Sequence, residues 1–534
     1  MNASSTGVQN LAGGFFSSAA RHPDRPALSL GEHQWNYAAL SARALLLGGA
    51  LLEDRIPDEP DFTGIFGHRS VAAFSGILGS LAIGRAYVPL NTHFPVERSR
   101  RMIEKAGLVR IVAEADSLPA LMEVVADIER PLWILVPDAD EGVDRVSRAG
   151  QHTFVYGVDA ATELATPLES VNVDALAYLL FTSGSTGDPK GVMVMHRNVR
   201  HFLDVMVDRY DIRPSDRLSQ TFDLTFDLSV FDMFVAWERG ACVCVPSRAQ
   251  KMLPAKYVAS QELTVWFSVP STAIMMRKLR MLKPDQYPSL RWSLFCGEAL
   301  PIEVAEAFQQ AAPRSVVENL YGPTELTIAC SYYRYDSDRC TADAKLDVVP
   351  IGEPYPGMTE LIADESLQPV EPGEAGELLM TGPQVARGYW QDAEKTSAAF
   401  VVPPGHSEVY YRTGDRVKRE SSAGPMLYLG RMDGQIKIQG YRVELGEIEA
   451  VLRKAAGVDT AIALGYPEGI NGADGVIAFI AESTVNEQSV RDVVQQHLPS
   501  YMQPTEYHWL PSFPLNANGK VDRGALRLIR NGSA

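Results

Sequence analysis

A glycine- and hydroxyl-rich segment follows an apolar run at residues 179–192, LLFTSGSTGDPKGV. Such a segment cannot lie in a hydrophobic core, so the apolar run must end where the chain reaches a ligand or solvent. Within the segment, Gly184 and Gly187 lie among the hydroxyl side chains Ser183, Ser185 and Thr186, and Lys190 follows. Glycines let a ligand approach the backbone, and hydroxyls with a lysine suit the oxygens of a polyphosphate.

The segment is not a Walker phosphate loop. That motif requires Gly-Lys followed by Ser or Thr at the start of a helix, whereas Pro189 and Gly191 flank Lys190 and disfavour a helix there. A polar connection after a buried strand would have a similar composition. The segment alone therefore does not establish nucleotide binding, and further motifs are needed.

The size and charge of the chain limit its possible functions. Its 534 residues exceed what one hydrophobic core organises, so at least two domains are expected. The net charge of −17 disfavours nucleic acid or an anionic membrane as the main partner. The five cysteines show no CxxC spacing, and neither a signal peptide nor a membrane-spanning run is visible. These features predict a cytoplasmic protein with reduced thiols.

Alternating helical and strand-like patterns predict an α/β fold with parallel, helix-covered sheets. Residues 69–84 have a helical pattern with small residues for close packing, and 196–210 form a second predicted helix. Predicted buried strands occupy residues 86–90, 108–115, 131–138 and 152–158.

Three later apolar runs end in small, polar or glycine residues, at 263–272, 293–301 and 316–330. Parallel strands place such ends at one edge of a sheet, where α/β folds bind their ligands. We therefore expect the three ends to meet in a common crevice.

The pattern changes twice towards the C-terminus. Residues 348–431 consist of short strands with Gly and Pro between them, which predicts a β-rich subdomain. From Asp433-Gly434 onward, an α+β unit of about 100 residues follows. We therefore predict a large N-terminal domain at residues 1–432 and a small mobile C-terminal domain at 433–534.

The tripeptide Phe-Asp-Leu occurs at residues 222–224 and again at 226–228, with another Phe-Asp at 231–232. In a helix this spacing would place the aspartates on one face. They would then either cap the helix that continues to Trp237, or one of them would face a cationic ligand.

Five segments, in this order and spacing, resemble the signatures of adenylate-forming enzymes. They are TSGSTGDPKG at 182–191, YGPTE at 321–325, YRTGD at 411–415, GRMDGQIKIQGYRVELGEIE at 430–449 and NGKVDR at 518–523. The FDLS and GYRVELGEIE sequences look like the amino-acid-activating adenylation domains of nonribosomal peptide synthetases and D-alanine carrier-protein ligases. The resemblance covers nearly the whole chain.

The resemblance implies a reaction in two halves. A carboxylate first attacks the α-phosphate of Mg-ATP to give an acyl-adenylate and pyrophosphate. The thiol of a carrier protein's phosphopantetheine then takes the acyl group as a thioester. ATP and Mg²⁺ are thus the expected cofactors.

The resemblance also implies roles for individual residues. The β- and γ-phosphates would be held by Thr182, Ser183, Gly184, Ser185, Thr186, Gly187 and Lys190, and Mg²⁺ by Glu325. Gly297, Glu298, Ala299, Tyr321 and Gly322 would hold adenine, Thr324 would touch the α-phosphate, and Asp415 with Arg431 would bind the ribose. Lys520 would bridge the carboxylate and the α-phosphate and have the largest catalytic effect, assisted by Lys190 and Thr324. Asp433 would be the hinge about which the C-terminal domain turns, removing Lys520 and bringing GYRVE to the pantetheine channel.

The substrate pocket follows from the repeated tripeptide. Only its second copy continues as Ser-Val-Phe, so Asp227 rather than Asp223 would bind a substrate ammonium. A buried carboxylate needs such a cation, which favours an amino acid over a fatty or aryl acid. By family alignment, the remaining pocket residues would be Leu228, Phe231, Phe267, Leu294, Cys296, Leu320, Ile328 and Ala329, with Lys520 reaching in.

This apolar pocket predicts a small to medium side chain, with proline or alanine as first choices and serine as a less favoured one. Without a carrier motif after Lys520, we expect a stand-alone enzyme with its carrier protein in trans. Two alternatives stay open: an acyl- or aryl-CoA synthetase of the same superfamily, and a non-catalytic amino-acid-binding regulator.

Overall fold

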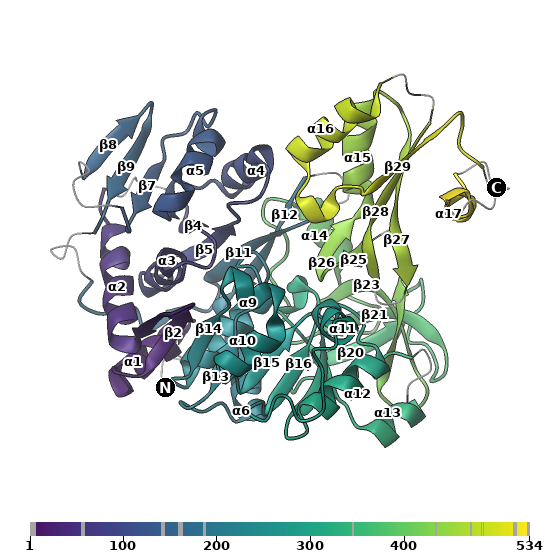
Figure 1. Ribbon diagram of the computed structural model, residues 1–534, viewed down its shortest axis with the longest axis horizontal. Helices are drawn as coiled ribbons and strands as arrows, with labels where there is room; N and C mark the ends of the chain where they lie inside the picture. Colours follow the sequence, from purple (N-terminus) through teal and green to yellow (C-terminus); the bar gives the residue numbers. More distant parts are fainter. Residues whose placement is uncertain are drawn as a thin grey trace.

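The computed structural model of the chain describes residues 7–54, 59–139, 145–158, 164–184, 188–343, 347–432, 435–469, 472–481, 483, 485–515 and 521–530. It confirms the predicted α/β fold. Two large, mainly parallel sheets form the body, a β-rich part adjoins them, and an α+β part lies beside them at upper right in Figure 1.

The first large sheet has the strand order β12-β11-β5-β4-β6-β7-β9-β8. Strands β11 to β9 along this order are parallel, and the edge strands β12 and β8 are antiparallel. Its strands are β4 (Phe62–Phe66), β5 (Ala86–Leu90), β6 (Arg110–Ala113), β7 (Trp133–Val136), β8 (Val146–Ala149), β9 (His152–Tyr156), β11 (Leu176–Thr182) and β12 (Lys190–Met195). The four strands predicted before residue 160 are therefore confirmed.

The second large sheet has the order β19-β18-β17-β16-β15-β13-β14-β2-β3, parallel from β17 to β2. Its strands are β2 (Pro26–Leu30), β3 (His33–Asn36), β13 (Arg217–Ser219), β14 (Cys242–Val245), β15 (Val265–Ser268), β16 (Trp292–Phe295), β17 (Val316–Tyr321), β18 (Ser331–Arg334) and β19 (Glu353–Pro354). Because β15, β16 and β17 are parallel neighbours, their carboxyl ends lie side by side, as predicted.

Helices cover both sheets, and the largest buried cluster draws its side chains from both (Figure 1). Helix α3 packs on α2 so closely that a Cβ on Gly79 would lie 2.7 Å from the Ala44 carbonyl, which explains the small residues. These helices are α1 (Gly13–Arg21), α2 (Tyr37–Ala50), α3 (Val71–Ala82), α4 (Val96–Ala106), η1 (Ala115–Ser117), α5 (Leu118–Val125), α6 (His196–Tyr210), α9 (Arg248–Met252), α10 (Pro254–Ser260), α11 (Pro270–Lys278), α12 (Ile302–Ala311), η4 (Thr324–Leu326) and α13 (Ser337–Asp343).

The aspartate repeat is not helical, contrary to the expectation from its spacing. The helix begins only at α7 (Leu228–Val230) and continues as a π-helix η3 (Phe231–Val235) and α8 (Ala236–Glu238). Asp223 lies in the preceding turn and accepts hydrogen bonds from Thr225. Asp227 makes no capping hydrogen bond to this helix. The aspartates therefore do not share a helix face, because the local turn bonds replace the helical ones.

The β-rich part comprises β20 (Thr359–Ala363), β21 (Ala375–Thr381), β22 (Phe400–Val401), β23 (Tyr410–Arg419) and β24 (Met426–Arg431), with helix α14 (Ala393–Ala399) beside them. A two-stranded sheet of β1 (Gly7–Gln9) and β10 (Ser170–Asn172) lies elsewhere.

The C-terminal part is the predicted α+β unit. Its sheet has the order β26-β25-β28-β27, with β29 paired to β28. Its elements are β25 (Gln435–Ile438), β26 (Tyr441–Glu444), α15 (Leu445–Ala456), β27 (Ala461–Gly469), β28 (Gly472–Ala481), α16 (Glu487–His497), η5 (Ser500–Met502), β29 (Glu506–Leu510) and α17 (Arg523–Arg530). It has a hydrophobic cluster of its own. The predicted boundary at residues 432 and 433 stays a prediction.

Within the described ranges, no helix is long and apolar enough to cross a membrane. All five cysteines are buried and free.

A buried charge cluster supports strand β17, whose end carries Tyr321. The Glu318 carboxylate is fully buried and accepts two hydrogen bonds from Arg209, at 2.9 and 2.7 Å. It also accepts bonds from Tyr210 at 3.1 Å and Arg334 at 3.0 Å. Removing the charge of Glu318 would leave the Arg209 guanidinium without the carboxylate that neutralises it, in a site with little access to water.

We therefore expect Glu318→Gln to lower the free energy of unfolding by about 3 kcal/mol, measured by urea titration. Glu303→Gln is the matched control, because Glu303 pairs with Arg277 at an exposed site, where loss of a pair costs about 0.5 kcal/mol. Equal effects of the two substitutions would contradict the role of the buried carboxylate.

Candidate active site

The glycine-rich segment connects two antiparallel strands. Thr182 at the end of β11 lies opposite Lys190 at the start of β12, so the segment is a hairpin connection and no helix follows it. A Cβ on Gly184 would lie 2.2 Å from the Asp188 carbonyl, so the chain folds back tightly here. The Thr182 hydroxyl is buried without a hydrogen-bond partner. Residues Ser185, Thr186 and Gly187 lie outside the described residues.

Lys190 lies in a buried charge cluster around Glu325. Its Nζ is 3.5 Å from Glu325 Oε1, and Arg442 donates to both Glu325 oxygens at 3.2 and 2.9 Å. The Tyr389 hydroxyl donates to Oε1 at 2.7 Å. Burial lowers the pKa of Lys190 to about 8. Despite its own burial, Glu325 keeps a lowered pKa, because Arg442 and Lys190 are close.

A cavity of about 390 Å³ opens beside this cluster, lined by residues from the ends of β16, β17, β23 and β24. Tyr321 lines it, and its hydroxyl donates to Asp415 Oδ2 at 2.5 Å. Arg431 lies opposite Asp415 across β23 and β24 and donates to Asp415 Oδ1 at 3.0 Å. Gly297, Ala299 and Gly322 also line it. The residues predicted for adenine and ribose thus share one cavity.

Asn319 and Glu298, two side chains at this cavity, differ in how free they are to bond a ligand. Asn319 lines the cavity, and its Oδ1 is buried without a hydrogen-bond partner, so an amino group can bond there. Glu298 does not face the cavity freely, because Ser271 and Gly440 donate backbone hydrogen bonds to it, at 2.8 and 2.6 Å. Burial raises the pKa of Glu298.

The β25–β26 hairpin of the C-terminal part enters the site. Its turn, Gln439-Gly440, has φ values of +51° and +83°, and a Cβ on Gly440 would lie 2.4 Å from Val269 Cγ1. Only glycine at position 440 therefore allows the turn to approach Val269 so closely. The Ser183 hydroxyl also contacts this hairpin and donates to the Arg442 carbonyl at 2.6 Å.

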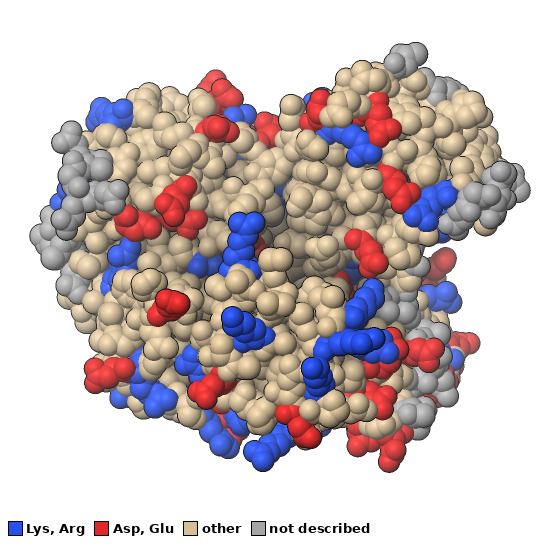
Figure 2. Space-filling view, viewed as in Figure 1, with Lys and Arg blue, Asp and Glu red and all other residues tan. Residues whose placement is uncertain are grey.

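A buried ion pair joins the same two parts of the chain. Arg98 on α4 donates to Glu447 on α15 at 2.6 Å, and both side chains are at least 95% buried. Tyr441 stacks on Tyr501 at 3.7 Å and meets the Phe226 ring edge at 4.5 Å. Figure 2 shows a hollow on this face where the C-terminal part meets the rest of the chain.

Lys437 on β25 lines both this nucleotide-sized cavity and a second, smaller one. Burial and the nearby Arg442 lower its pKa, while Asp415 raises it. Lys437 is thus a cation that the hairpin brings to both cavities, where its charge acts on Asp227 and Asp415.

The smaller cavity, of about 80 Å³, adjoins Asp227. Asp227 is 7% exposed, and its Oδ2 has no hydrogen-bond partner. Burial raises its pKa to about 6, against hydrogen bonds from the Thr324 hydroxyl and the Ile328 backbone. Asp223, in contrast, accepts a bond from Asn91 at 2.9 Å and lies 3.4 Å from His68, away from this cavity.

The predicted pocket residues divide into two groups. Leu228 and Cys296 line the smaller cavity with Asp227, and Leu320 lines the larger one. The others are at most 1% exposed and lie in the main hydrophobic cluster: Phe231, Phe267, Leu294, Ile328 and Ala329.

Asp433 and Lys520 lie outside the described residues. The segments beside Lys520 are described: Leu515 bridges Val521, and Val521 packs in a cluster with Leu526. In Figure 1, α17 lies at the outer edge of the C-terminal part, on the side away from the large sheets.

Comparison with protein families adds the deciding observation. Residues 15–390 match the family described as AMP-binding enzyme, and residues 447–520 match the AMP-binding enzyme C-terminal domain. The chain belongs to the AMP-binding enzyme family. The enzyme is thus a ligase of the adenylate-forming type, as its motifs predict.

Relatives of the enzyme include carrier-protein ligases and peptide synthetases. It is 33% identical to the L-proline–[L-prolyl-carrier protein] ligase of Streptomyces coelicolor, over 96% of this chain and 95% of that one. It is 34% identical to tyrocidine synthase 3 of Brevibacillus parabrevis, over 96% of this chain and only 7% of that protein. Among solved structures, the adenylation domain AlmE of Vibrio cholerae with glycyl-adenosine-5'-phosphate matches with a TM-score of 0.86, at 30% identity, covering 100% and 99% of the two chains.

Sequence reasoning missed four residues of the enzyme's site. Asn319 is a polar residue in a mostly apolar strand, and Tyr389 follows a glycine between β21 and β22. Lys437 and Arg442 lie on the paired strands β25 and β26, opposite each other, just before the GEIE sequence. A polar side chain within an apolar strand was a usable signal for Asn319, but nothing local showed that Tyr389 and Arg442 would meet Glu325.

Proposed function

We propose that the enzyme activates a small to medium apolar amino acid as its aminoacyl-adenylate and transfers it to the phosphopantetheine thiol of a separate carrier protein. Proline and alanine are the first choices, and serine is less favoured. The observation that carries the proposal is the unpartnered Oδ2 of Asp227, a buried carboxylate beside a cavity. A substrate ammonium would pair with it, whereas an acid without an amine would leave it unpaired.

The relatives support the same reaction. One is named for proline transfer to a carrier protein, and one similar structure holds a glycyl-adenylate. A third, PA1221, contains an adenylation domain and a carrier domain in one chain, at 25% identity and a TM-score of 0.77.

ATP fits the larger cavity. Asp415 and Arg431 would bind the ribose, Tyr321 would stack on adenine, and the free Asn319 Oδ1 would accept a bond from the adenine amine. Thr182 and Ser183 line the adjoining smaller cavity, Lys190 lies beside Glu325, and the three would hold the phosphates. The predicted shares of Ser185 and Thr186 in this role stay proposals.

Glu325 fits Mg²⁺, because it is an ionised carboxylate in a buried site that already holds two cations. A hard cation prefers such oxygens together with phosphate oxygens. Bound there, Mg²⁺ would neutralise charge on the transferring phosphoryl group. Thr324 would orient the α-phosphate while it holds Asp227.

The arrangement seen here suits the second half of the reaction. Arg442 is hydrogen-bonded to Glu325, the Gly440 turn lies against Val269, and Lys437 lines both cavities. Arg442 and a Mg²⁺-bound nucleotide would compete for the one carboxylate. We therefore infer that the C-terminal part turns about Asp433, so that Lys520 serves adenylate formation and the hairpin serves thioester formation.

The proposed function is tested by pyrophosphate exchange with a panel of amino acids, fatty acids and aryl acids. We expect exchange with at least one small apolar amino acid and none with acids that lack an amine. Asp227→Asn should lower the amino-acid kcat/KM at least 100-fold, while ATP binding stays unchanged. Exchange with amine-free acids alone would instead identify an acyl- or aryl-CoA synthetase, and ATP-independent amino-acid binding a regulator.

Two substitutions separate the half-reactions. Gly440→Ala should slow the consumption of preformed aminoacyl-adenylate by pantetheine at least tenfold, with pyrophosphate exchange within about twofold of wild type. Gly457→Ala is the control: it has a similar φ, +64°, but open space around its Cβ. Lys520→Ala should have the opposite pattern: it should slow pyrophosphate exchange at least 100-fold and leave the consumption of preformed adenylate near the wild-type rate. Exchange at the wild-type rate in Lys520→Ala would contradict this assignment.

The pKa of Asp227 predicts a pH dependence of amino-acid binding. The carboxylate must be ionised to hold an ammonium, so affinity should be constant above about pH 7 and fall about tenfold per pH unit below its pKa of about 6. Of the groups that act on it, Glu325 stays ionised over this range, because its pKa is lowered by Arg442 and Lys190. The measurement is the amino-acid KM at saturating ATP between pH 5 and 8, and a flat profile would contradict the prediction.

A further inference from the structure

The closed end of the predicted amino-acid pocket is filled by the residues that were expected to line it. Phe231 and Phe267 are fully buried, and their ring centroids are 4.6 Å apart at an interplanar angle of 61°. Phe222 packs edge-on against Phe267 at 4.9 Å. None of the three rings lines the cavity beside Asp227, because they pack on one another in the core.

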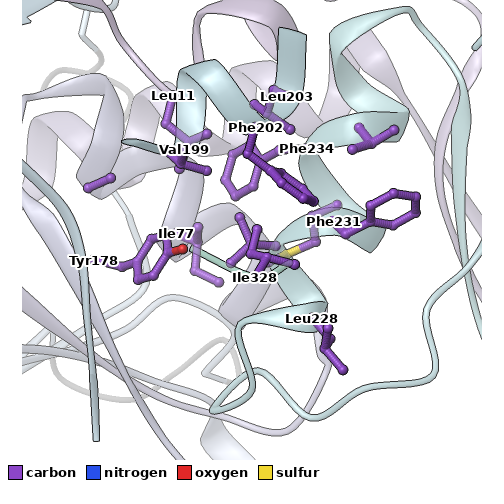
Figure 3. Close-up of a cluster of buried hydrophobic side chains, with 14 of the residues drawn as sticks. Leu11, Ile77, Tyr178, Val199, Phe202, Leu203, Leu228, Phe231, Phe234 and Ile328 are labelled. Atoms are coloured by element: carbon purple, nitrogen blue, oxygen red, sulfur yellow. The ribbon is translucent and has the colours of Figure 1, made fainter. Parts of the chain in front are cut away.

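The aromatic wall cannot recede, because buried groups support it from behind. Tyr210 and Phe202 contact the Phe231 ring at 6.1 and 6.3 Å. Tyr210 is itself fixed by the hydrogen bond of its hydroxyl to Glu318. Figure 3 shows Phe231 and Ile328 within the buried cluster that contains Phe202. Shifting such a wall forces side chains off their rotamers in a close-packed core.

The opposite wall is equally tight. A Cβ on Gly322 would lie 2.5 Å from Ala329 Cα, so no side chain can enter between them. The Cys296 thiol lies against the backbone N–H groups of Gly297 and Gly322, and its pKa is raised by burial. Leu228 and Cys296 therefore face each other across a space that has little freedom to widen.

The space that remains beside Asp227 is small. The cavity measures about 80 Å³ and also extends to Phe94, Arg98 and Tyr501. At about 10–15 Å³ for each water-sized group, it holds roughly six such groups. The ammonium, Cα and carboxylate of any amino acid use most of that room.

We infer that the substrate is glycine or alanine. This inference rests on the proposed function. Of the amino acids named there it keeps alanine, it adds glycine, and it excludes proline and amino acids with branched side chains. The ammonium pairs with Asp227, the Cα lies between Leu228 and Cys296, and the Phe231–Phe267 pair closes the pocket directly behind it.

The direct test is pyrophosphate exchange with glycine, both enantiomers of alanine, proline, valine, leucine and phenylalanine. Glycine or an alanine enantiomer should exceed each larger amino acid at least 100-fold in kcat/KM, since each excess methylene costs about 10–200-fold. Proline, valine or leucine at a comparable kcat/KM would overturn the inference.

A pair of substitutions tests the wall itself. Phe267→Leu should raise the ratio of kcat/KM for valine over that for alanine at least tenfold, because it removes ring atoms at the closed end. Phe234→Leu is the matched control: this buried ring lies in the same π-helix as Phe231 but packs against Trp237, and the ratio should not change.

Phe231→Leu provides a second opening of the same wall if Phe267→Leu does not fold, as judged by circular dichroism and thermal melting. An unchanged ratio in the folded variant would overturn the inference. Failure of the proposed function is distinguishable: in that case no amino acid supports exchange in the wild-type enzyme, although ATP still binds.

Discussion

The charge of Glu325 is the constraint on which the arrangement of this enzyme depends. A fully buried carboxylate is tolerated only when cations and hydrogen-bond donors surround it, and here they come from three distant stretches of chain. Lys190 lies at the start of β12, near the end of the glycine-rich segment. Tyr389 comes from the β-rich part and Arg442 from the C-terminal part. The carboxylate therefore holds together three parts of the chain that the proposed reaction uses.

The same carboxylate gives a physical reason for two arrangements of the chain. Arg442 satisfies Glu325 when the hairpin is in the site, and a metal ion with nucleotide phosphates would satisfy it when the hairpin is out. In neither arrangement would the buried Glu325 carboxylate lack a cation beside it. The tight turn at Gly440 and the buried Arg98–Glu447 pair stabilise the first arrangement. Both contacts would be lost if the C-terminal part rotated.

The sequence predicted most of what depends on local pattern. Apolar runs ending in small residues predicted β15, β16 and β17 and their common edge, because strand length and burial are visible in a short window. The five motifs predicted the family. Prediction failed at the aspartate repeat, where a turn replaced an expected helix, since local bonds from Thr225 and a distant bond from Asn91 satisfy the Asp223 carboxylate. Phe231 and Phe267 were placed in the pocket by the family resemblance, and short-range sequence pattern could not show that their rings pack on each other in the core.

The most direct test of the shared carboxylate is a distance between the two parts of the chain. Spin labels at Met252→Cys and Leu528→Cys would lie on exposed positions of α9 and α17, and all native cysteines are buried. Double electron–electron resonance would compare the free enzyme with the enzyme bound to Mg²⁺ and a non-hydrolysable ATP analogue. The account predicts a clear shift of the distance distribution on binding, because the metal and phosphates displace Arg442 from Glu325. An unchanged distribution at saturating nucleotide would contradict it.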